Sequence, residues 1–122
     1  MNNNSQLMKN FLKLEYGVLL LFFISLVYSH QLFSPWVLLI FWYPDIAFFG
    51  YLFGSKVGAI AYNLTHYFGT AVGLFAIATI FQIELLEYLS LIQLAHICFD
   101  RFLGYGLKYT KGFKYTHLGE LK

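Results

Sequence analysis

The chain has 122 residues, of which 59% are hydrophobic, 21% aromatic and only 11% charged. A soluble domain carries about 25% charged residues, so this composition excludes an ordinary soluble globule and indicates a single domain, residues 1–122, in a lipid bilayer. The formal net charge of +2 is too small for a nucleic-acid-binding protein. The single cysteine, Cys98, excludes a disulfide framework and a cysteine-rich zinc site.

Four apolar stretches follow one another along the chain, at residues 11–29, 36–53, 57–80 and 85–103. Each reaches or approaches the ~20 residues that cross a bilayer as a helix, and four strands are too few to close a membrane barrel. The connections are short, which favours antiparallel neighbours. The sequence therefore predicts an all-α integral membrane protein, a four-transmembrane-helix up-down bundle.

The basic residues orient this predicted bundle. Lys9 and Lys13 open the first span, Lys56 lies in the second connection, and the others follow or end the fourth span. Lys and Arg concentrate on the cytoplasmic side of membrane proteins. All of them share one side if both termini are cytoplasmic, so we predict a multi-pass protein with a cytoplasmic interfacial tail, residues 104–122.

Two features leave details of the spans open. The first span has a basic start and an apolar middle, so it also fits a cleaved signal peptide. The second span contains Pro44, and proline breaks helices. That span is therefore either continuous or two half-helices, and in the second case Asp45 would cap the restarted helix.

Every predicted span carries an ionisable residue: Glu15, Asp45, His66, and His96 with Asp100. Such residues are costly in a bilayer and usually face the interior of the bundle. At ~1.5 Å per residue, all five fall in the cytoplasmic half of the membrane. His96 and Asp100 are four residues apart and so share a helix face. We expect the five side chains to form one buried cluster.

Histidines and carboxylates together suit iron, manganese or zinc. We interpret Asp45, His66, His96 and Asp100 as ligands of a divalent metal ion, and Glu15 as a fifth ligand or a general base. A metal with an open position activates water for hydrolysis. Without a metal, the same groups would relay protons or form a structural hydrogen-bonded core.

The tail alternates glycines, aromatic residues and lysines between Gly104 and Gly119. One interpretation is an interfacial segment whose aromatic rings lie among the lipid headgroups and whose lysines attract anionic lipids. The other is a lid over the cluster, in which Arg101, Lys108 and His117 bind a phosphate or carboxylate group of a substrate.

Several short motifs carry a family resemblance, and together they run from Glu15 to Gly119. They are Pro44-Asp45, Gly50-Tyr51, Tyr62-Asn63 with His66, His96 with Asp100-Arg101, Gly104-Tyr105-Gly106-Leu107-Lys108-Tyr109, Gly112-Phe113 and Thr116-His117-Leu118-Gly119. With these motifs the chain resembles a bacterial family named domain of unknown function 4260. The resemblance implies a small multi-span protein of the bacterial inner membrane, without an established activity and without catalytic residues to carry over. Pro44-Asp45 and His96 with Asp100 are also similar, more faintly, to motifs of membrane-bound metal-dependent hydrolases.

Three functions are therefore compatible with the sequence. The first is a metal-dependent hydrolase acting on an amphipathic or lipid-linked substrate reached from the cytoplasmic leaflet. The second is a non-enzymatic polar core in a small carrier, a proton-coupled transporter or a homo-oligomer, whose contact would use a stripe of small and polar residues on the third span. That stripe comprises Ala59, Asn63, His66, Thr70 and Gly73. The third is a binding module whose tail docks a soluble partner.

Overall fold

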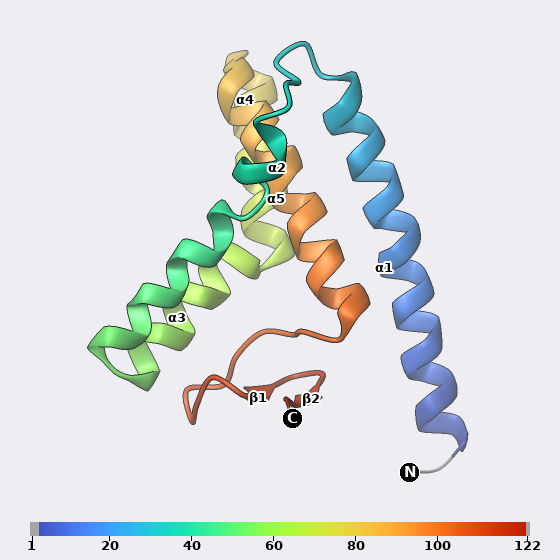
Figure 1. The fold of residues 1–122 in the computed structure, drawn as a ribbon, viewed down its shortest axis with the longest axis vertical. Helices are drawn as coiled ribbons and strands as arrows, with labels where there is room; N and C mark the ends of the chain where they lie inside the picture. The colour runs from blue at the N-terminus through green and yellow to red at the C-terminus, as the bar shows by residue number, and fades with distance from the viewer. Residues whose placement is uncertain (1–2, 122) are drawn as a thin grey trace.

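The computed structural model describes residues 3–121, which form an all-helical fold with one short β-pair (Figure 1). The chain ascends through α1, descends through α2 and η1, ascends again through α3 and α4, and descends through α5, so both termini lie at the same end. The predicted helical class is confirmed. The elements are α1 (Asn3–Ser29), α2 (Val37–Ile40), the 3-10 helix η1 (Tyr43–Phe53), α3 (Ser55–His66), α4 (Phe68–Phe81), α5 (Glu84–Leu103), β1 (Tyr115–Thr116) and β2 (Gly119–Glu120).

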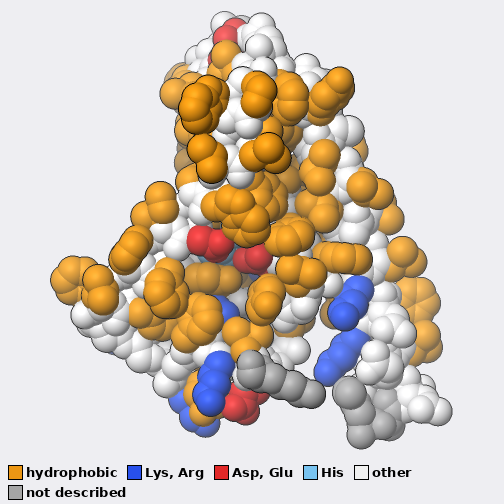
Figure 2. Space-filling model, in the orientation of Figure 1, with side chains coloured by type: hydrophobic (Ala, Val, Ile, Leu, Met, Phe, Trp, Pro, Cys, Tyr) orange, Lys and Arg blue, Asp and Glu red, His pale blue; other side chains and the backbone are white. Residues whose placement is uncertain are grey.

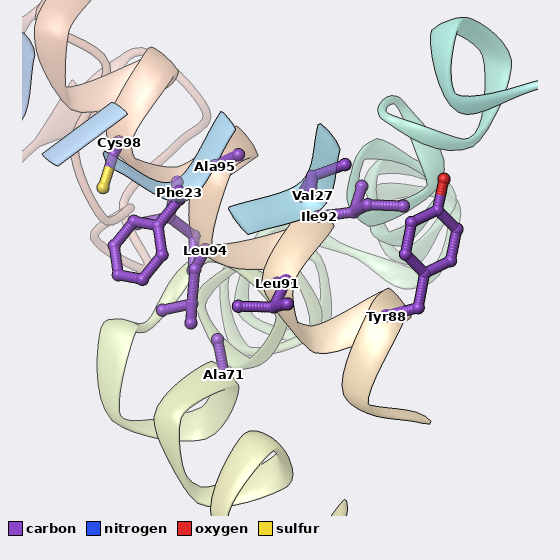
Figure 3. Packing of buried hydrophobic residues seen from close by; sticks show 10 residues of the cluster. Phe23, Val27, Ala71, Tyr88, Leu91, Ile92, Leu94, Ala95 and Cys98 are labelled. Atoms are coloured by element: carbon purple, nitrogen blue, oxygen red, sulfur yellow. The ribbon is translucent and has the colours of Figure 1, made fainter. Parts of the chain in front are cut away.

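Helix α5 is the centre of the fold. An unbroken run of its side chains, from Ser90 to Cys98, is buried, because α1 packs on one side of it and α4 on the other. Figure 3 shows Phe23 and Val27 of α1 and Ala71 of α4 around α5 in this core. The helix ends at Gly104, whose φ of 94° is a left-handed conformation that glycine adopts without steric cost.

The four predicted spans are reproduced only in part. Among the described residues, α1 alone is long and apolar enough to cross a membrane, and α3 with α4 would make a second span if the bent pair counts as one. Only 11% of the apolar window of α1 is buried in the protein, whereas the core helix of a soluble protein is mostly covered. One or two such helices give weak support to a membrane location.

The second predicted span is broken, as the alternative interpretation allowed. α2 ends at Ile40, and η1 restarts at Tyr43 with Pro44 in its first turn, where the missing N–H of proline is harmless. Asp45 does not cap this helix. Its backbone N–H already donates to the Trp42 carbonyl at 3.0 Å, and its side chain points to two histidines.

The 3-10 helix η1 forms a tight hairpin with α3. A Cβ atom at Gly58 would lie 2.3 Å from the Tyr51 ring, so the close approach of the two helices requires glycine there. This hairpin brings the start of η1 and the end of α3 to the same level. It thereby places Asp45 beside His66.

The third predicted span is also broken, between α3 and α4, which are bent by 49°. Tyr67 between them is extended, with φ −83° and ψ 127°. In a continuous helix the carbonyls of Thr65 and His66 would accept backbone hydrogen bonds. Here they accept from α5 instead, through Gln93 Nε2 at 2.8 Å and Arg101 Nη2 at 3.3 Å. Side chains of α5 therefore replace the backbone hydrogen bonds that are lost at the break.

The break also divides the predicted stripe of small residues. Ala59 and His66 are buried on α3, but Gly73 on α4 is exposed, and a Cβ atom added there would meet nothing within 4 Å. The stripe is therefore not one continuous packing surface within the chain. Its α3 half includes His66, which lies beside Asp45.

Candidate metal centre

Four ionisable side chains from three elements meet beside α5. Asp45 comes from the first turn of η1, His66 from the last residue of α3, and His96 and Asp100 from successive turns of α5. One ligand atom from each lies within 4.8 Å of all the others. Both histidines and Asp100 are buried, whereas the Asp45 side chain is 44% exposed. Four of the five side chains that were expected to cluster therefore lie together, with the open side at Asp45, whereas Glu15 is not among them.

The backbone fixes the orientation of both imidazole rings. Nδ1 of His96 lies 2.8 Å from the Phe41 carbonyl, and Nδ1 of His66 lies 2.9 Å from the Tyr62 carbonyl. A carbonyl oxygen can only accept, so each Nδ1 carries a proton and donates it. In a neutral ring this leaves the Nε2 lone pair free, and both Nε2 atoms point into the cluster. Metal-binding histidines show this same arrangement.

The separations inside the cluster fit a bound cation. Nε2 of His66 and Nε2 of His96 are 3.2 Å apart, and each lies 3.1 Å from Asp45 Oδ1. Their distances to Asp100 Oδ2 are 3.3 and 3.4 Å. Ligands at 2.0–2.1 Å from a tetrahedral zinc ion are about 3.3 Å apart. Adjacent ligands of a six-coordinate ion with bonds of ~2.1 Å are about 3.0 Å apart. The donor set therefore fits the predicted metals in either geometry.

Aromatic side chains surround the four ligands. Tyr62 stacks on His66 with ring centroids 3.8 Å apart, and its hydroxyl donates to Asp100 Oδ2 at 3.3 Å. Phe41 and Trp42 contact the His96 ring, with centroids 5.1 and 5.8 Å away. These rings limit the approach of water and hold the imidazoles in place.

A cavity of about 720 Å³ leads to the cluster. Asp45 and Asp100 line it together with Lys108 and a wall of apolar side chains: Trp42, Phe48, Phe49, Phe99, Leu103 and Phe113. Figure 2 shows acidic side chains in a hollow framed by hydrophobic ones, with histidine beneath them. The cavity is thus amphipathic, with two carboxylates and a lysine beside a largely apolar lining.

Lys108 of the tail is the basic residue of this cavity. Its side chain is buried, and its Nζ lies 4.0 Å from the centroid of the Phe113 ring and 4.8 Å from that of Tyr62. Burial lowers the pKa of the Lys108 ammonium group. The Asn63 side chain holds the Lys108 backbone, accepting its N–H at 2.6 Å and donating to its carbonyl at 2.7 Å.

The remaining predicted site residues lie outside the cluster. Arg101 binds the His66 carbonyl and donates to the Tyr16 hydroxyl at 3.2 Å, so it joins α1, α3 and α5. His117 accepts the Leu107 N–H at 2.8 Å within the tail, and burial, with Arg101 nearby, lowers its pKa. Glu15 is exposed on α1 and is not one of the four clustered residues.

A comparison with protein families matches the model described as Domain of unknown function (DUF4260) to residues 9–121. The chain belongs to this family. The match covers all four clustered residues and the tail with Lys108, so the whole site lies within the DUF4260 domain. No curated protein matches this DUF4260 chain, and no solved structure does.

Two contributions to the site in this DUF4260 chain were not assigned from the sequence. Asn63 looked like part of a packing stripe, and its role in holding Lys108 depends on where the tail folds. Trp42 and the phenylalanines of η1 were only part of the second predicted span, and no role in the site was assigned to them. The signal for Asn63 was its position three residues before His66, on the same face of the helix.

Proposed function

We propose that this protein is a membrane protein that binds a divalent metal ion through Asp45, His66, His96 and Asp100 and hydrolyses an amphipathic substrate. The observation that carries the proposal is the convergence of four ligand atoms within 4.8 Å. With both Nδ1 protons directed to carbonyls, two imidazole lone pairs and two carboxylates face one another. Such a set of acceptors needs a cation between them.

Charge balance favours the metal. Two carboxylates carry −2, so a divalent ion with two neutral histidines makes the buried cluster neutral. Iron, manganese and zinc accept this combination of imidazole and carboxylate ligands. The metal would supply Lewis acidity and lower the pKa of a bound water. Hydrolysis needs a coordination position beyond the four protein ligands, which favours a six-coordinate ion.

The cavity suggests the type of substrate. Its lining combines aromatic side chains with Asp45 and Asp100, so an apolar chain would lie along the aromatic side chains with the reacting bond at the cluster. A carboxylate of the cluster would take the proton of the attacking water. Glu15 is left out of this proposal because it is exposed on another helix.

The surface supports a membrane location. Leu21, Leu38 and Leu52 are 69%, 75% and 80% exposed, and apolar surface of this extent is favourable in lipid and costly in water. On the face shown in Figure 2, Lys and Arg side chains gather toward the end where both termini lie. We infer four passes through the bacterial inner membrane, with that end in the cytoplasm. Phe23 and Val27 of α1 belong to the core, which favours an uncleaved first helix.

The proposal is tested with chromogenic long-chain esters of carboxylic and phosphoric acids, presented to the detergent-purified protein after loading with zinc, manganese or iron. We expect turnover that chelation abolishes and metal restores, and that falls at least about 100-fold in His96→Ala. The matched control is His30→Ala, because His30 pairs with Glu87 far from the cluster. Equal turnover in His96→Ala would contradict the metal mechanism, and a metal-loaded protein without turnover would contradict hydrolysis.

A second candidate is a metal-free polar core in a proton-coupled transporter, a small carrier, an oligomer or a binding module. The specific observation in its favour is that separations of 3.1–3.4 Å also fit charged hydrogen bonds between protonated histidines and aspartates. Two imidazolium groups would balance two carboxylates. A protein that takes up no metal but keeps this cluster would favour this candidate.

A further inference from the structure

The Lys108 side chain is in an unusual environment. Only 4% of Lys108 is exposed, yet none of the ion pairs among the described residues includes its ammonium group. Its neighbours are the faces of Phe113 and Tyr62. Aromatic faces stabilise a cation only modestly, whereas burying a charge without a counter-charge is costly. The carboxylates of Asp100 and Asp45 favour the charged form of Lys108 from across the same cavity. A metal ion that neutralised these carboxylates would leave Lys108 in need of another anion.

The position of this ammonium group is fixed by α3. Asn63 binds both the N–H and the carbonyl of Lys108, and the Ser55 hydroxyl binds the carbonyl of Thr110. Asn63 and His66 lie three residues apart on one face of α3, so the same helix holds a ligand of the metal centre and the backbone of Lys108. The ammonium group is therefore positioned relative to the cluster.

Lys108 and the cluster share one cavity. Asp45, Asp100 and Lys108 all line it, and most of its other lining residues are aromatic or aliphatic. A metal-loaded cluster would be neutral, so Lys108 would give the cavity a net positive charge. A ligand that complements both the positive charge and the apolar lining of the cavity would present several anionic oxygens and an apolar chain. A phosphate group carries up to about two charges at neutral pH and several acceptor oxygens, and lysine binds phosphate as a point charge.

We propose that this cavity is a site for an amphipathic phosphate ester, with the phosphate group between the metal centre and Lys108 and the alkyl chain along the aromatic lining. The inference rests on the proposed function for the metal contact, but the contact with Lys108 is independent of it. Lys108 is a substrate-binding residue in this account, and Asn63 is the residue that positions it.

Trp42 provides the readout, because it lines the cavity, and the other tryptophan, Trp36, lies outside it and is 68% exposed. In a Trp36→Phe background, fluorescence of Trp42 is followed as decyl phosphate is added to the protein in a nonionic detergent. Decanol and decanoate serve as the neutral and carboxylate probes. Each titration is made with and without metal, and bound metal is measured in every sample.

We expect decyl phosphate to bind more tightly than decanol and decanoate, and Lys108→Met to weaken it by about tenfold or more, the loss expected for one charge-assisted contact. Lys108→Arg, which keeps the charge, should bind within about threefold of the parent. The matched control is Lys111→Met, since Lys111 also lies over an aromatic ring, 4.3 Å from the centroid of Tyr115, but is exposed and outside the cavity.

The outcomes separate the two proposals. Lys108-dependent binding without any bound metal would support the anion site and overturn the metal hydrolase. Bound metal with decyl phosphate affinity unchanged in Lys108→Met would overturn the anion site and leave the metal centre. Tighter binding of decanoate than of decyl phosphate would overturn the assignment to phosphate esters. Limited proteolysis of Lys108→Met verifies that its tail stays docked. If the tail is released, Lys108→Glu is compared with Lys108→Arg instead, and their relative affinities must follow the charge at the cavity.

Discussion

Asn63 connects the two halves of the site. Its amide group binds both backbone groups of Lys108, at 2.6 and 2.7 Å, in the way a neighbouring strand would. Other contacts also hold the tail, because the Ser55 hydroxyl donates to the Thr110 carbonyl and Phe113 packs against the rings of Phe48 and Tyr51. Asn63 is the side chain of α3 that binds the Lys108 backbone directly.

Asn63→Leu removes both hydrogen bonds while keeping a side chain of similar size. Two hydrogen bonds contribute about 1–3 kcal/mol together, so we expect release of the tail to become about 5- to 150-fold more frequent. Limited trypsin cleavage at Lys108, Lys111 and Lys114 measures this release. Asn10→Leu is the control, because Asn10 is exposed on α1 and bonds only to Gln6 in a neighbouring turn. Equal cleavage rates in the two variants would contradict a docked tail.

The four clustered ligands were predictable from the sequence because ionisable residues are conspicuous in apolar stretches. His96 and Asp100 follow from helical spacing alone, and Asp45 and His66 follow from comparing depths along antiparallel segments. The depth estimate placed Glu15 in the same half of the membrane as the four ligands, but depth along a helix does not tell which way a side chain faces. Tyr16 rather than Glu15 turns inward on α1, where its hydroxyl meets Arg101.

The break between α3 and α4 is the element that shapes the site. It ends α3 at His66 and leaves the carbonyls of Thr65 and His66 for Gln93 and Arg101. Neither proline nor glycine occupies position 67, so local sequence gave no sign of a break there. The break near Pro44 was foreseeable, because proline is a local signal, whereas this one depends on side chains of another helix.

Gln93→Leu tests the support of this break. The substitution removes the donor to the Thr65 carbonyl, whereas the Tyr43 hydroxyl, which Gln93 also accepts from, keeps the Leu89 carbonyl as an acceptor. A buried polar group without a partner costs about 1–3 kcal/mol, so we expect a lower thermal midpoint of unfolding and faster hydrogen exchange around residues 66–70. Gln31→Leu, at an exposed position of the first loop, should change neither. Equal midpoints of unfolding in the two variants would show that α5 does not stabilise the break between α3 and α4.

At the scale of the whole molecule, the up-and-down order of the elements matches the prediction, although the second and third predicted spans are each broken into two helices. The composition predicted an apolar exterior, and large apolar side chains are exposed on α1, α2 and η1. What composition could not show is that the second half of α5, with Asp100 and Arg101, is buried among the other elements of the protein.

The proposed membrane topology has a direct test with single cysteines. After Cys98→Ala, a cysteine is introduced at Gln31, Gln82 or Ser55, all exposed positions in or beside turns. A membrane-impermeant maleimide added to intact cells should label the Gln31→Cys and Gln82→Cys variants, because these turns lie opposite the basic end. Ser55→Cys should react only after permeabilisation. Labelling of Ser55→Cys in intact cells would contradict the four-pass orientation.

The central claim, that the cluster is a metal centre, is tested most directly by metal content. The protein is purified in mild detergent without a metal-binding tag and compared by mass spectrometry with an Asp45→Ala, His96→Ala double variant and with His30→Ala, both verified to be folded. We predict about one iron, manganese or zinc ion per chain in the parent and in His30→Ala, and none in the double variant. An absence of metal from the parent after loading, or equal metal in the double variant, would contradict the metal centre.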